Sequence, residues 1–67
     1  MATITLNGKP HEIAKAAPLV ELLASLGVDR RLIAVGHNGE VIPRDRYDGV
    51  WINEGDTVEV VRMVGGG

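Results

Sequence analysis

The feature that most limits the possible folds is one short helix-forming segment in an otherwise strand-like chain. Four leucines recur at i, i+3, i+4 and i+7 and so share one face of a helix: Leu19, Leu22, Leu23 and Leu26. We expect this helix to have Pro18 in its first turn, behind a weak cap at Ala17, and to end at Gly27. A helix of about ten residues is unstable alone in water, so it must pack on a sheet.

The segment before the helix predicts a β-hairpin. Polar and apolar residues alternate over residues 3–6, and Asn7-Gly8 follows, a pair that favours the positive φ angles of a tight turn. Residues 10–13 read as the returning strand. The register stays open: a two-residue loop sets His11 opposite Ile4, whereas a three-residue loop with a bulge shifts the pairing by one residue.

The segment after the helix predicts further strands. Residues 32–35 are an apolar run, Asn38-Gly39 is a second turn, residues 44–49 are polar and irregular, and residues 57–64 form the last strand. The last strand must return to the centre of the sheet. We therefore expect an α+β fold, in which one main helix covers one face of a four- to five-stranded mixed sheet and the other face is free for a partner.

Length and composition exclude several classes of protein. Sixty-seven residues make one domain, and a formal charge of -2 argues against nucleic acid as the main partner. No apolar run is long enough to cross a membrane, and the first residues do not resemble a signal peptide, so we expect a cytoplasmic protein. Without cysteine there is no disulfide framework, cysteine nucleophile or thiolate metal site. With no Phe, the core should be aliphatic.

Nothing in the sequence has the spacing of an enzyme's active site. His11 and His37 are too far apart to suggest a pair of ligands, and we interpret them as surface or sheet histidines. Asp56 follows Gly55 and is typical of a turn. The basic residues at 30–31 and 44–46 form either a solvated surface or a contact for an acidic partner.

The last strand departs from strict alternation near its end. Val61 and Met63 share the parity of Thr57 and Glu59, which should face solvent. Two alternatives stay open. Either both apolar side chains are exposed, or a bulge shifts the phase and buries Val61 in the core.

The three glycines that end the sequence have no evident role in folding. We expect residues 1–64 to form a single domain and residues 65–67 a flexible tail, which extended would reach roughly 10 Å. A peptide without Cβ atoms can thread a narrow channel and bring its carboxylate to another protein's active site. There it could attack the α-phosphate of ATP and form an acyl-adenylate. The alternative is a frayed tail or a cloning remnant.

Taken together and in order, these segments resemble the ThiS family of sulfur carrier proteins. The resemblance rests on Asn-Gly-x-x-x-Pro-Arg at residues 38–44, Gly-Asp-x-Val-Glu at residues 55–59 and the terminal Gly66-Gly67. The first hairpin turn and the helix also look like that family, so the likeness covers essentially the whole chain. It implies the ubiquitin-like β-grasp fold, which agrees with the order of elements expected above.

The resemblance also implies a function in which the chain is a protein co-substrate and not an enzyme. An E1-like adenylating enzyme, using ATP and Mg, would activate the carboxylate of Gly67, with Gly65 and Gly66 threading its channel. A cysteine desulfurase or rhodanese-like sulfur donor would then supply the sulfur of a thiocarboxylate. Thiazole synthase would take that sulfur for the thiazole of thiamine. The chain itself would bind no cofactor and be a monomer when free.

Partners of this family grip the free sheet face and the last strand. We expect Val61 and Met63 to form the centre of that patch and Arg62 or Arg44 to orient the partner. Other functions fit the same tail: a sulfur carrier for molybdopterin or another sulfur-transfer pathway, a ubiquitin-like modifier joined to lysines, or an interaction module with an inert tail.

Overall fold

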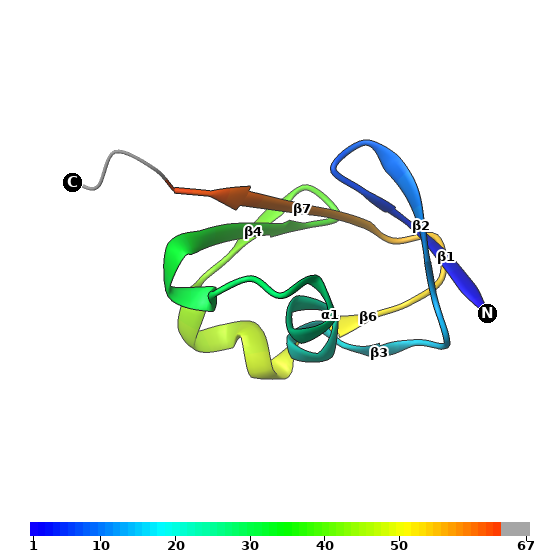
Figure 1. The fold of residues 1–67 in the computed structure, drawn as a ribbon, viewed down its shortest axis with the longest axis horizontal. Helices are drawn as coiled ribbons and strands as arrows, with labels where there is room; N and C mark the ends of the chain where they lie inside the picture. The colour runs from blue at the N-terminus through cyan, green and yellow to red at the C-terminus, as the bar shows by residue number, and fades with distance from the viewer. Residues whose placement is uncertain (64–67) are drawn as a thin grey trace.

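A two-stranded hairpin begins the fold in the computed structural model, which describes residues 1–63 (Figure 1). β1 (Ala2–Leu6) pairs antiparallel with β2 (Lys9–Ile13), and Ile4 lies opposite His11. Asn7, with φ 51°, and Gly8, with φ 81°, form the two-residue turn. The two-residue loop is therefore confirmed, and the bulged alternative is wrong.

The single α-helix, α1 (Leu19–Leu26), buries the predicted face and ends as expected. Leu19, Leu22 and Leu23 are buried, and Leu26 is half-buried. Gly27 adopts φ 71° at the C-terminal cap, a conformation that glycine accepts without strain. With eight residues, α1 is the longest helix in the described part of the chain, so no helix there could span a bilayer.

The start of the helix differs from the sequence prediction. Pro18 lies outside the first turn: it has extended backbone angles, and Ala17–Pro18 forms the short strand β3, which pairs with β6 (Trp51–Ile52). The Leu19 N–H donates to the Val50 carbonyl over 2.8 Å. This neighbouring strand satisfies a free N–H of the helix, so no side-chain cap is needed there.

The remaining strands complete a five-stranded mixed sheet. β4 (Ile33–His37) pairs antiparallel with both β5 (Glu40–Ile42) and β7 (Thr57–Arg62), and β7 also runs parallel to β1. The strand order is β2-β1-β7-β4-β5, so the last strand is central, as expected. The leucines of α1 pack on the same core as Ile4, Val35 and Val58 of the sheet. The predicted α+β fold is confirmed.

Two 3-10 helices fill the segments for which the sequence predicted no regular structure. η1 (Arg30–Leu32) precedes β4, and η2 (Arg44–Gly49) follows β5. η2 buries Tyr47, which is 1% exposed and the largest fully buried side chain, so the expectation of a purely aliphatic core was wrong. Its ring packs in the core, and the Arg30 guanidinium lies 5.5 Å from the ring centroid.

Candidate docking face and carrier strand

β7 leads the chain towards its C-terminal residues and is held on both sides. On one side it pairs with β4, from His37 opposite Val58 to Ile33 opposite Arg62, and the Met63 N–H donates to the Leu32 carbonyl over 2.8 Å. On the other side it pairs with β1. A central strand with two hydrogen-bonded neighbours is a rigid anchor for whatever follows it. The predicted tail, residues 65–67, and Val64 lie outside the described residues.

The side chain of Asn7 extends the pairing of β7 beyond the end of β1. Its Oδ1 accepts from the Val60 N–H over 2.8 Å, and its Nδ2 donates to the Val60 carbonyl over 3.2 Å. The amide of Asn7 thus replaces the backbone of one strand residue. Asn38, in the second turn, acts similarly on Thr57, whose N–H donates to its Oδ1 over 2.8 Å. Sequence analysis recognised these asparagines only as turn residues.

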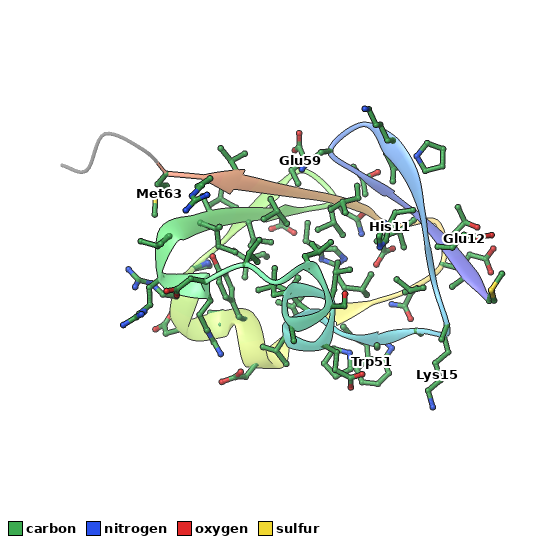
Figure 2. All side chains as sticks on the ribbon, viewed as in Figure 1. His11, Glu12, Lys15, Trp51, Glu59 and Met63 are labelled. Atoms are coloured by element: carbon green, nitrogen blue, oxygen red, sulfur yellow. The ribbon has the colours of Figure 1, made fainter. Side chains whose placement is uncertain are left out.

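The free face of the sheet carries an exposed apolar strip. Val61 is 59% exposed and Met63, just past β7, is 54% exposed, so the exposed alternative is confirmed and a bulge that buries Val61 is wrong. Val41 of β5, which the sequence analysis did not single out, is 81% exposed. In Figure 2, Met63 lies where the described chain ends, and Glu59 points away from the helix.

Val41 and Val61 face each other across a shallow groove of about 190 Å³, which we call the sheet groove. Ala34 and Gly36 of β4 lie between them, because Ala34 pairs with Val61 and Gly36 with Val41. Because both residues are small, the groove stays open between the two valines. A Cβ at Gly36 would lie 3.6 Å from Glu59 Oε1 and 3.7 Å from the Glu40 carbonyl oxygen, which are ordinary contact distances, so packing does not require a glycine there.

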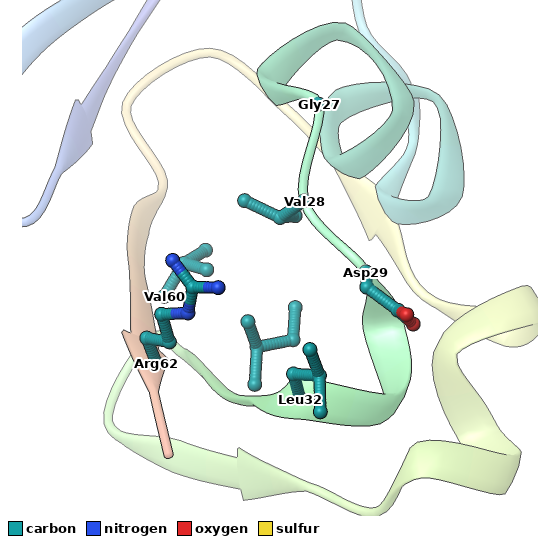
Figure 3. A pocket seen from close by; sticks show the side chains of 7 residues that line it. Gly27, Val28, Asp29, Leu32, Val60 and Arg62 are labelled. Atoms are coloured by element: carbon teal, nitrogen blue, oxygen red, sulfur yellow. The ribbon is translucent and has the colours of Figure 1, made fainter. Parts of the chain in front are cut away.

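Arg62 and Arg44, the predicted orienting residues, do not lie with Val61. Arg62 alternates with Val61 along the strand and lines a cavity of about 250 Å³ on the other side of the sheet, with Val28, Asp29 and Leu32 (Figure 3). Arg44 begins η2, beyond the end of β5. Of the residues predicted to bind a partner, Val61 therefore lies on the free face of the sheet, whereas Arg62 and Arg44 lie at the end of the sheet.

The polar contacts of Asp56 and His37 lie at the opposite end of β7. The Asp56 carboxylate accepts from the Asn53 N–H over 2.9 Å and lies 2.8 Å from His37 Nε2. Burial raises the pKa of Asp56, but the hydrogen bonds from Asn53 and His37 outweigh burial and hold that pKa below its usual value. The turn role predicted for Asp56 is confirmed. Among residues 1–63 no cluster of His, Asp and Glu side chains is suited to hold a metal ion.

Known proteins with similar sequences match nearly the whole of this chain. A sequence model of the ThiS family matches residues 4–67. The sulfur carrier protein ThiS of Bacillus subtilis is 35% identical over 65 residues, which cover 96% of this chain and 98% of that protein. The chain belongs to the ThiS family. The Bacillus subtilis relative is named a sulfur carrier protein.

The structural comparison agrees with this assignment. The crystal structure of the thiamine biosynthesis protein ThiS from Geobacter metallireducens is 37% identical, with a TM-score of 0.84, and covers 97% of this chain and 99% of that one. The β-grasp fold implied by the ThiS resemblance is thereby confirmed.

Two further relatives of this ThiS chain are much longer proteins. The thiazole synthases of Paramagnetospirillum magneticum and Magnetococcus marinus are 38% and 41% identical to it over 64 residues. Those residues cover 96% of this chain but 20% of each synthase. The chain therefore spans about one fifth of the length of these relatives.

Proposed function

We propose that this chain carries sulfur to the thiazole of thiamine as a thiocarboxylate on Gly67. The observation that supports this most strongly is the end-to-end likeness to sulfur carriers, since the family match runs through Gly67 itself. The relatives reported above are named for thiamine biosynthesis, sulfur carriage or thiazole synthesis, which favours this function over the alternatives that share the tail, a molybdopterin carrier or a protein modifier.

The proposed cycle needs little chemistry from the carrier itself. A carboxylate oxygen of Gly67 attacks the α-phosphorus of ATP on an E1-like adenylating enzyme, and pyrophosphate leaves. The terminal sulfur of a persulfide on a cysteine desulfurase or rhodanese-like donor then displaces AMP and forms an acyl disulfide. A thiol attacks the donor-side sulfur of that S–S bond, forms a new disulfide with the donor and releases the thiocarboxylate. Mg and the adenylating enzyme stabilise the phosphate charge, and this chain contributes position and reach.

The fold suits this role because it combines a fixed strand with a short reach. Four residues follow Met63, and a chain of four residues spans at most about 14 Å. The body of the carrier must therefore dock close to the active site that receives Gly67. The sheet groove lies beside the last residues of β7; Glu59 also lines it, and the apolar side chains of Val41 and Val61 are suited to such a contact.

Thiazole synthase is the proposed acceptor of the sulfur. Two proteins named thiazole synthase contain a segment similar to nearly all of this chain. A carrier segment within the same polypeptide as a synthase keeps donor and acceptor at high effective concentration. This supports the same pairing for the present chain.

The direct test is the mass of the intact protein after incubation with an E1-like adenylating enzyme, MgATP and a sulfide source. We expect the mass to rise by the difference between one sulfur and one oxygen, with the change located on Gly67 by fragmentation. A variant that lacks Gly66 and Gly67 is the control, because it keeps every described residue. Modification of that variant, or no modification of the natural sequence, would contradict the proposal.

A further inference from the structure

The arginines of this chain gather at one end of the molecule. All five lie in three short segments: η1, η2 and the last residue of β7. Both lysines, Lys9 and Lys15, lie elsewhere, on the edge strand β2 and in the turn that follows it. The arginines thus lie at one end of the molecule, and the lysines lie away from it.

Sheet pairing brings these separate segments together. Ile33, directly after η1, is opposite Arg62 in the β4–β7 pair, and Figure 1 shows the start of β4, η2 and the end of β7 at the same end of the molecule. The Arg30 side chain reaches from η1 to η2, where it lies over the Tyr47 ring and 3.5 Å from Asp48. We call this set the arginine collar: Arg30, Arg31, Arg44, Arg46 and Arg62.

Two of the five collar arginines pair with an aspartate at the same end of the molecule. The Arg31 guanidinium binds Asp29 over 2.9 Å and, with the Arg31 N–H, holds the pKa of Asp29 at about 2. Arg30 pairs with Asp48. The other three arginines are Arg44, Arg46 and Arg62. Within residues 1–63 they have no carboxylate within 4.0 Å, and their exposed side chains are directed to solvent or to surface cavities.

The charge at this end is opposite to that of the rest of the chain. Residues 29–31, 44–48 and 62 contain five arginines and three aspartates, a formal charge of +2. The remaining residues contain two lysines and six acidic residues, a formal charge of -4, and the sum is the chain's -2. Because charges in physiological salt are screened beyond about 8 Å, a partner at this end meets the local charge and not the net charge.

We propose that the arginine collar docks against an acidic rim on the adenylating enzyme, around the opening that admits the C-terminal residues. This inference rests on the proposed function. Arg62 is itself the last residue of β7, and η2 and the start of β4 lie at the same end of the molecule (Figure 1), so an enzyme that reaches Gly67 meets this end. A positive end also offsets the repulsion between the Gly67 carboxylate and the anionic ATP that it must approach.

The chemistry of the collar favours an acidic protein surface over a nucleic acid. Affinity for nucleic acid comes largely from neutralising many phosphates, whereas the segments of the collar carry a formal charge of only +2 and, within residues 1–63, three arginines without a carboxylate partner. A planar guanidinium group can donate a bidentate pair of hydrogen bonds to a carboxylate. The collar therefore suits a few carboxylates placed around an opening.

The test compares two charge reversals of equal size at opposite ends of the molecule. Arg44→Glu with Arg62→Glu alters the collar, whereas Lys9→Glu with Lys15→Glu makes the same change in net charge elsewhere; all four side chains are exposed. The probe is the E1-like adenylating enzyme that converts the natural sequence to the thiocarboxylate. The association rate constant is measured by stopped flow from low to high salt.

We expect the collar variant to associate at least about tenfold more slowly at low salt, with the difference lost near 1 M salt. The lysine variant should stay within about twofold of the natural sequence. An unchanged rate for the collar variant, or equal slowing of both variants, overturns the proposal. If the reversed variant does not fold by circular dichroism, the neutral pair Arg44→Gln and Arg62→Gln must show a smaller slowing in the same direction.

Failure of the collar and failure of the proposed function give different results. If no adenylating enzyme converts the natural sequence, the proposed function fails, and this inference fails with it. If conversion occurs but the collar variant associates normally, only the collar inference fails. Binding of a short DNA or RNA duplex that disappears in the collar variant would identify a nucleic-acid site and overturn the acidic rim.

Discussion

Replacing Asn7 with glycine should loosen the central strand at one residue, Val60. The change removes both hydrogen bonds between the Asn7 side chain and the Val60 backbone. Glycine accepts the φ of 51° found at this position, so backbone strain does not contribute. The variant thus isolates the contribution of the side-chain amide to the end of β7.

The expected loss of stability is modest but measurable. Each hydrogen bond contributes roughly 0.5–1.5 kcal/mol, and the exposure of Asn7 places both at the low end, so the free energy of unfolding should fall by about 1 kcal/mol. In a domain of this size, such a change lowers Tm by about 4–8 °C. Asn7→Ala should cost about 1 kcal/mol more, because alanine is strained at positive φ. Asn38→Gly removes the bond from the Thr57 N–H and a 3.4 Å contact with His37 Nε2, so it should also lower the free energy of unfolding, by up to about 1 kcal/mol.

Hydrogen exchange followed by NMR gives the residue-level check. In Asn7→Gly the Val60 amide should exchange faster, whereas the Val61 amide, whose residue pairs with Ala34 of β4, should keep its protection. Urea unfolding followed by circular dichroism gives the global value. Unchanged exchange at Val60, or an unchanged free energy of unfolding in Asn7→Gly, would refute the role assigned to the side chain.

Three further predictions test the docking face, the acid response and the core. Val61→Asp should weaken binding to the adenylating enzyme at least about tenfold, or about 1.4 kcal/mol, while Thr57→Asp, exposed on the same side of β7, should bind normally in calorimetry. Because the pKa of Asp56 is lowered in the folded state, its ionised carboxylate stabilises the fold at pH values above the unfolded pKa of about 3.9. This contribution is lost as pH falls through the folded pKa. Asp56→Asn should therefore flatten the decline of the urea midpoint from about pH 6 to about pH 3. Tyr47→Ala should cost about 3–5 kcal/mol and leave little folded protein by circular dichroism, whereas Tyr47→Phe should stay folded.

The elements that the sequence predicted are those set by short-range preferences. The leucine spacing of α1 and the glycine after it are local signals, and so are the two Asn-Gly turns. The exposure of Val61 followed from alternation once a bulge was absent. These features depend on neighbours within a few residues, which is why a single sequence carries them.

The features that were missed depend on contacts between distant segments. Tyr47 lies among charged residues in a segment without strand or α-helical periodicity, yet a turn of 3-10 helix points it into the core. Pro18 begins no helix because a strand more than thirty residues later pairs with it. Val41 and Val61 become one surface only through the order of β5, β4 and β7. In each case pairing of the sheet overrides the local pattern.

The parallel pairing of β1 with β7 has a practical consequence for anyone who works with this carrier. Two neighbouring strands that run in the same direction begin at one end of the sheet and finish at the other, so Ala2 and Arg62 lie at opposite ends of the molecule (Figure 1). An affinity handle or fluorescent reporter ahead of Met1 would stand clear of the proposed docking surface. The same addition after Gly67 would occupy the carboxyl group itself.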